Sequence, residues 1–362
     1  MKNIHKRLLL LFLPTLLLSS CGGNADRAAQ SEAGQKTDAA LTETQKQDAS
    51  EASASDLPDH ITEETILSGK TLRIDAETET HGFADAAEVT IAADEEKMRS
   101  LAEELLKLRY PEAPGFESAG EEAWQYAENG NTVFEFAVSD SGGFYYMDIP
   151  DNINGVWLEM NHLFEYGYIT EQVPDGLTLS AEEAAEEAGS FLENDSDFTF
   201  RPWNVLAIGG DEGSDRSGYY EISLQAYMDG IPVSVNGEAN TRGFYAVARY
   251  SDTGLFSMEG FAPFSERERR VLEETVSPEQ IVEAFRGNFD FFCSGETLEV
   301  NRIYFEYYPA DNGDGSYTLT PVWAFDCVDT RTELETYETE PVVQRYSVLY
   351  YAEDGSFCGV YY

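Results

Sequence analysis

Four cysteines are the residues of this chain whose thiols could act as nucleophiles, bind a metal or form disulfides. Cys21 lies near the N-terminus, whereas Cys293, Cys327 and Cys358 all lie in the last 70 residues. No two cysteines are separated by two residues, so we expect neither a zinc site nor a dithiol redox motif. The three later cysteines could form one disulfide in three ways, or all could stay reduced and buried. The sequence leaves both alternatives open.

Histidine and carboxylate side chains are the other candidates for catalysis. Histidine occurs four times, at His5, His60, His81 and His162, and no pair has the spacing of a helical zinc motif. The 68 Asp and Glu residues could contain the two carboxylates of a glycoside hydrolase, but such a pair is recognised by its separation in space. We therefore predict no catalytic, cofactor-binding or metal-binding residue, and we expect a protein that is not an enzyme.

The first residues of the chain have the layout of a secretory signal. A basic start is followed by an apolar run over residues 8–18, too short to cross a bilayer, which needs about 20 apolar residues. Two serines precede Cys21 and two glycines follow it. This arrangement resembles the lipobox of bacterial lipoproteins. The resemblance implies that residues 1–20 are a signal peptide and that the Cys21 sulfur is lipidated, which anchors the chain to a membrane.

Residues 21–69 are predicted to form a disordered linker behind this anchor. They are rich in Ala, Ser, Thr, Gln and charged residues and contain no aromatic residue. Such a composition cannot bury enough apolar surface to offset the entropy lost on ordering. About 300 residues remain, and the 42% hydrophobic content of the chain is enough for a packed core.

The chain is strongly acidic, with 23 Lys and Arg against 68 Asp and Glu and a formal net charge of −45. Nucleic acid is excluded as a partner because phosphate binding requires basic side chains. The same charge is repelled by anionic headgroups, so we expect contact with the membrane through the lipid at Cys21 only. A cationic protein or peptide is the favoured partner.

Two stretches of the sequence look like copies of one unit. Ser180 with Glu183, and Ser277 with Gln280, have the spacing of a helix capping box. Each predicted helix precedes strands and a final hairpin, and the offset between the copies stays near 100 residues, which is typical of a duplication. We therefore predict α+β repeats over residues 178–262 and 263–362.

A weaker third copy is expected upstream, in an N-terminal α+β unit over residues 70–177. A helix over 94–109 is followed by a hairpin with strands at 132–138 and 144–149. The predicted fold class is α+β, built from repeated units of one helix and an antiparallel sheet.

Short phrases at residues 227–233 and 321–325, together with the repeated helix, resemble the PepSY-like and YycI-like modules of Gram-positive surface proteins. With Ile74-Asp75-Ala76 in an early strand, the chain also resembles uncharacterised surface lipoproteins of clostridial bacteria. The resemblance implies a regulatory or inhibitory role towards an envelope protein and offers no catalytic residues.

These observations favour a lipid-anchored, extracytoplasmic protein of a Gram-positive cell that binds an envelope protein or peptide. An envelope glycoside hydrolase and a carbohydrate-binding lipoprotein are the alternatives. The sequence does not indicate the oligomeric state.

Overall fold

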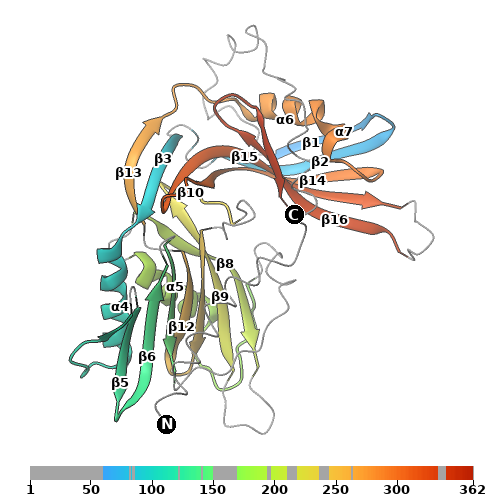
Figure 1. Cartoon of the computed structure of the whole chain (residues 1–362). Coiled ribbons are helices and arrows are strands. Elements are labelled where there is room, and N and C mark those ends of the chain that lie inside the picture. The colour runs from blue at the N-terminus through green and yellow to red at the C-terminus, as the bar shows by residue number, and fades with distance from the viewer. Residues whose placement is uncertain are drawn as a thin grey trace.

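The computed structural model describes residues 60–361 except 81–82, 84–85, 121–122, 140–141, 150–168, 194–196, 210–217, 236–243, 262–263 and 333–339. Within these residues, 57% lie in strands and 17% in helices. The strands form two large sheets of eight and nine strands, which cross at a steep angle (Figure 1). Cys21, the predicted signal peptide and most of the predicted linker lie outside the described residues.

The eight-stranded sheet joins the start of the described chain to its end. Its main path runs β1-β2-β14-β15-β16-β17, and β15 also pairs with β3, which pairs with β13. The pairing of β2 with β14 is parallel and the others are antiparallel. The bounds are β1 His60–Leu67, β2 Lys70–Glu79, β3 Ala87–Ala93, β13 Phe264–Val271, β14 Thr297–Asp311, β15 Ser316–Arg331, β16 Val342–Tyr351 and β17 Phe357–Tyr361.

The nine-stranded sheet is antiparallel throughout. It runs β10-β9-β11-β12-β7-β6-β5-β4, and β8 also pairs with β9. The bounds are β4 Glu117–Gly120, β5 Ala123–Glu128, β6 Asn131–Val138, β7 Gly143–Asp148, β8 Thr199–Ile208, β9 Tyr219–Met228, β10 Ile231–Pro232, β11 Tyr245–Ser251 and β12 Gly254–Phe261. The predicted hairpin at 132–138 and 144–149 is confirmed as β6 and β7.

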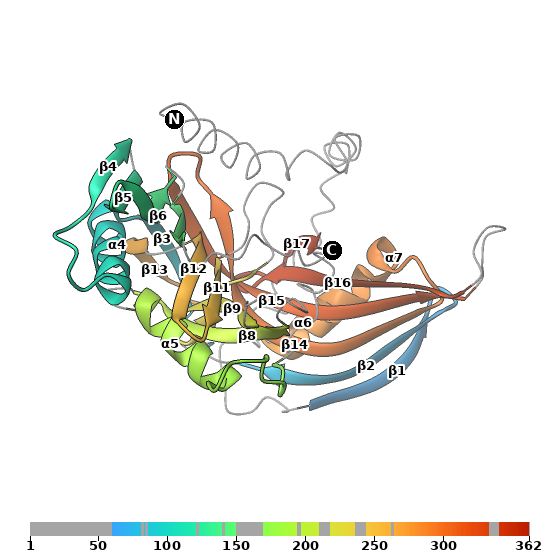
Figure 2. The same ribbon diagram turned by 90° about the horizontal axis from the view of Figure 1, so that it is seen from below.

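The described helices cover one face of each sheet (Figures 1 and 2). Helices α4 and α5 pack on the nine-stranded sheet, and Phe285 of α6 stacks on Phe325 of the other sheet with ring centroids 4.4 Å apart. The helix bounds are α4 Glu95–Arg109, α5 Ala181–Glu193, α6 Pro278–Gly287 and α7 Phe289–Phe292. None of these helices has the length and apolar character needed to cross a membrane.

The predicted helix starts are confirmed by their capping bonds. Ser277 and Gln280 form a reciprocal capping box at α6, with Pro278 in the first turn. Ser180 and Glu183 exchange the same two bonds at α5, at 2.9 and 3.2 Å. Local spacing therefore located these helices correctly.

The predicted α+β class is wrong, because the strands of successive units do not stay together. Strand β7 pairs with β12, which merges the strands after α4 with those after α5 into one sheet. Strand β2 pairs with β14 across more than 200 residues of sequence. The result is a mostly β protein in which helices are a minor cover.

The end of the predicted linker also needs correction. Residues 60–67 form β1, an eight-residue strand in regular antiparallel register with β2. Burial alternates along the strand, with every second residue from Ile61 to Leu67 half-buried, which is the pattern of a strand with one face on the core. Ile61 and Leu67 face the core, so this short segment buries apolar surface although it has no aromatic residue.

Candidate functional site

The strongest electrostatic perturbations among the described carboxylates lie where the two sheets meet. Five side chains gather there on the helix-free face of the eight-stranded sheet, and we call them the corner cluster. They are Glu79 of β2, Arg302, Tyr304 and Glu306 of β14, and Asp326 of β15.

Strand register brings these side chains together. Arg302 lies opposite Asp326, and Tyr304 pairs with Glu79 on its other side. Phe325 faces α6, so its neighbour Asp326 points to the opposite face because successive strand residues alternate. A bulge between Val300 and Arg302 shifts the register on both sides of β14. Bulges of this kind re-aim side chains, as happens here at Arg302.

Arg302 is held in place by two partners. Its Nε and Nη2 donate to the two carboxylate oxygens of Glu79 at 2.8 and 2.7 Å, and its guanidinium carbon lies 4.2 Å from the centre of the Tyr304 ring. A planar guanidinium suits this bidentate and stacked arrangement, which fixes the cation beside the two acids.

Asp326 is a deeply placed acid with two neutral donors. Its Oδ1 accepts hydrogen bonds from the Tyr304 hydroxyl at 3.2 Å and from Ser347 Oγ at 3.1 Å. Burial raises the pKa of Asp326 above its ordinary value, and Arg302 and the two hydroxyls only partly offset this rise.

Glu306 is the most perturbed member of the cluster. The residue is 2% exposed, and its Oε1 has no hydrogen-bond partner among the described residues. Burial and the nearby charge of Asp326 raise the pKa of Glu306, a hydrogen bond from Ser234 and the charge of Arg302 oppose the rise, and the resulting pKa is about 8. Glu306 therefore carries a proton at pH 7.

Both sheets contribute to this corner. Ser234 follows β10, and its backbone N–H donates to the carbonyl of Tyr307 at 2.8 Å. Tyr227 of β9 stacks under Arg201, with 4.6 Å between the guanidinium carbon and the ring centre. Burial raises the pKa of Tyr227, and the charges of Arg201 and Arg302 oppose the rise.

The geometry of the corner cluster suits a proton-linked junction between the sheets better than a catalytic centre. A glycoside hydrolase places its two acids on either side of the bond that breaks. Glu306 instead lies under the protein surface and is bonded to Ser234, so a glycan cannot contact it in this structure. Its chemistry is the gain or loss of a buried proton.

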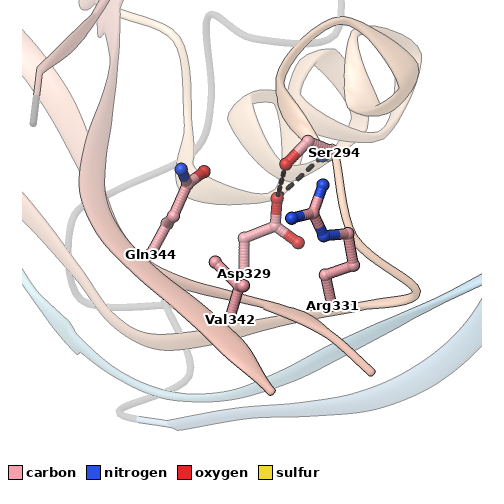
Figure 3. A pocket seen from close by; sticks show the side chains of 5 residues that line it. All are labelled: Ser294, Asp329, Arg331, Val342 and Gln344. Carbon is pink, nitrogen blue, oxygen red and sulfur yellow. Dashed lines mark hydrogen bonds between the residues drawn. The ribbon is translucent and has the colours of Figure 1, made fainter. Parts of the chain in front are cut away.

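A second site is a small hollow beside α7, seen from close by in Figure 3. Its volume is about 50 Å³, enough for a few water molecules and small beside the roughly 300–1,000 Å³ of sites for drug-sized ligands. Asp329 in its wall accepts bonds from the Ser294 N–H at 2.7 Å, the Ser294 hydroxyl at 2.8 Å and the Gly295 N–H at 3.0 Å. The carboxylate therefore holds the chain that leaves α7. The hollow is lined by Ser294, Asp329, Arg331, Val342 and Gln344.

Within the described part of the chain, none of the three later cysteines forms a disulfide. Burial raises the pKa of Cys293 to about 11 and that of Cys327 well above its ordinary value, so neither thiol is a nucleophile at neutral pH. Cys358 is half-buried and lies on the helix-free face. The structure thus favours the reduced alternative that the sequence left open.

The candidate histidines are scattered. His60 begins β1, and its Nε2 lies 2.7 Å from Asp75 Oδ1. His81 and His162 lie outside the described residues, as does Cys21. Sequence reasoning missed the corner cluster. The available signal was a glutamate between aromatic residues at Tyr304-Phe305-Glu306-Tyr307, which is unusual inside a strand buried on both faces.

Comparison with known proteins gives a fold likeness only. No family model and no curated protein matches the chain, so the likeness to PepSY-like and YycI-like modules stays a prediction. Among solved structures, an uncharacterized protein from Eubacterium rectale ATCC 33656 is similar over 84% of this chain and 94% of its own, with a TM-score of 0.52 and 18% identity. At this identity the likeness indicates a shared fold and carries no activity.

Proposed function

We propose that this chain is a non-catalytic binding protein of the cell envelope, anchored outside the cytoplasmic membrane by lipid at Cys21. One observation carries the proposal. Glu306 and Asp326, the acids whose pKa is raised by burial, are enclosed where the sheets meet, whereas most of the other described carboxylates face solvent. We therefore infer that exposed residues, and not an enclosed site, bind the partner.

The proposed location rests on the chain before the described residues. The basic start, the short apolar run and the small residues around Cys21 support secretion followed by lipidation. Two or more acyl chains give stable anchoring, while the acidic body is repelled by anionic headgroups. The proposed host is a cell with a single membrane, of the Gram-positive kind.

The proposed partner is a cationic protein or peptide of the envelope. A net charge of −45 attracts such a partner over distances near the Debye length, about 8–10 Å at physiological salt. It also disfavours nucleic acid. The buried position of Glu306 gives no support to a glycoside hydrolase, so we keep a single candidate function.

Crosslinking on intact cells tests the proposal. A reagent that cannot cross the membrane is applied to cells that produce the wild-type protein or the Cys21→Ser variant. We expect the wild-type protein to be modified and to capture the same basic protein repeatedly, and the variant to leave the membrane fraction. A chain that the reagent never modifies, or that captures nothing above background, contradicts the proposal.

A further inference from the structure

The free edge of β1 is a regular row of backbone hydrogen-bonding groups. β1 ends the path of the eight-stranded sheet and pairs only with β2 among the described strands, as the blue ribbon in Figure 1 shows. Ser68 and Gly69 both have positive φ, 53° and 83°, between the paired residues Leu67 and Lys70. This is the geometry of a two-residue hairpin turn.

The turn determines which groups face outward. In such a hairpin the pair next to the turn exchanges both backbone bonds, and the alternation then repeats along the strand. Ile61, Glu63, Thr65 and Leu67 therefore bond to β2. The N–H and C=O groups of Thr62, Glu64 and Ile66 point away from the sheet, and their side chains lie on the exposed face.

The other described edge strands are short, bulged or carry proline or arginine, whereas the protection of β1 is limited to the two charged residues Glu63 and Glu64. Natural edges are protected by short length, bulges, proline or charged residues. The protected edges are β4, with four residues and a bulge; β8, with Pro202 and a bulge; β10, with two residues; β13, with a bulge and three arginines; and β17, with five residues and a bulge. β1 runs for eight residues in unbroken register without Pro, Lys or Arg.

The side chains beside this edge define the partner's chemistry. Glu64 lies on the exposed face of β1, whereas Glu63 lies on the opposite face and forms an ion pair with Arg286 of α6. Glu77 lies opposite His60 in β2. The Glu64 side chain is 64% exposed although Arg73 contacts it, and Ile66 is 75% exposed. An added strand can place a basic side chain beside the Glu64 carboxylate and an apolar side chain beside Ile66. These two residues of the added strand are two positions apart, so their side chains lie on the same face.

We propose that the β1 edge binds a basic, extended peptide segment as an additional antiparallel strand. The inference rests on the proposed binding function and names its site and partner. Backbone bonds to Thr62, Glu64 and Ile66 supply the affinity, and a Lys or Arg opposite Glu64 supplies the selectivity. A second copy of β1 is disfavoured, since it brings two Glu63-Glu64 pairs together on chains of net charge −45.

The probe is the synthetic peptide Ac-Val-Thr-Lys-Lys-Thr-Val-amide, added to the full chain purified in detergent. In antiparallel register its first valine lies beside Ile66 and its two lysines beside Glu64 and Glu63. Two control peptides accompany it. One has both lysines replaced by glutamate, and the other is N-methylated at the third and fifth residues, whose N–H groups would face β1.

Two protein variants separate the backbone and charge contributions. Thr62→Pro removes an outward N–H without breaking a bond to β2, and proline is tolerated at such an edge position. Glu64→Lys reverses the charge, and Glu268→Lys on the exposed face of β13 is its matched control. Circular dichroism melting of each variant verifies that the fold is retained.

We expect the lysine peptide to bind and to protect the amides of Thr62, Glu64 and Ile66 from hydrogen exchange. Binding should weaken at least roughly tenfold in Thr62→Pro and Glu64→Lys and with either control peptide, and should stay unchanged in Glu268→Lys. Equal binding of the lysine and glutamate peptides, or full binding by Thr62→Pro, overturns the inference. If sedimentation shows that the wild-type chain self-associates and that Thr62→Pro abolishes this association, the β1 edge binds a second copy of the chain and the inference is overturned. Because these measurements use purified protein, they stay valid even if the location proposed for the chain is wrong.

Discussion

Replacing Glu306 by glutamine tests the electrostatics of the sheet junction. The amide has the size of the protonated acid and never ionises, so Glu306→Gln removes one titration and little packing. An acid with a raised folded-state pKa contributes stability that is complete below its unfolded pKa and is lost as pH rises through the folded pKa. For Glu306 that window runs from the ordinary value of 4.5 to about 8.

The size of the effect follows from the same two values. Between the unfolded-state and the folded-state pKa, the carboxyl group stays protonated in the folded state only. Each pH unit in this range lowers the free energy of unfolding by about 1.4 kcal/mol. The wild-type protein should therefore lose on the order of 5 kcal/mol between pH 4.5 and 8 through this residue, and Glu306→Gln should lose none of it.

Urea unfolding at pH 5, 7 and 9 measures this difference. We expect the two proteins to differ by about 1 kcal/mol or less at pH 5 and the variant to be more stable by several kcal/mol at pH 9. Glu268→Gln on β13 is the control, since its side chain is exposed. Parallel stability curves for Glu306→Gln and the wild-type protein would refute a buried, protonated Glu306.

Three further predictions concern the core. Arg109→Met should destabilise the protein by about 3–5 kcal/mol in urea unfolding, because it leaves the buried Asp148, 2.6 Å from Arg109 Nε, without its cation; a loss below 1 kcal/mol contradicts a buried ion pair. Under non-reducing conditions a thiol reagent should react first with Cys358 and should reach the two buried thiols only after unfolding. The denatured chain should then contain three reactive thiols besides Cys21. A count of one would indicate a disulfide. Gly260→Ala should lower the melting temperature, because the added Cβ would lie 2.5 Å from the Tyr245 carbonyl oxygen. At Gly287 the added Cβ meets no atom within 4 Å, so Gly287→Ala should raise stability by up to about 1 kcal/mol. Equal melting temperatures of the two variants would contradict the close packing at Gly260.

Local sequence signals located the elements whose partners are also local. The capping spacing of Ser277 and Gln280 marks the start of α6, and the hairpin of β6 and β7 follows from its turn residues. These features depend on bonds between residues at most a few positions apart, so a short window of sequence contains them.

The sheets could not be predicted in the same way. Strand β2 pairs in parallel with β14, and no local pattern in either strand names the other. The α+β prediction failed at this step, because it kept each helix with the strands that follow it in the chain. The corner cluster was missed for the same reason. Glu306 and Asp326 come together only through the register of β14 with β15, and acidic residues are too common in this chain for any one to stand out.

The mass of the N-terminal peptide, taken from protein in the membrane fraction, tests the central claim most directly. The account predicts a chain that begins at Cys21 and carries a diacylglyceryl group on that sulfur. A peptide with a free Cys21 thiol, or one that retains residues 1–20, would contradict the proposal that this acidic β protein is tethered outside the cell.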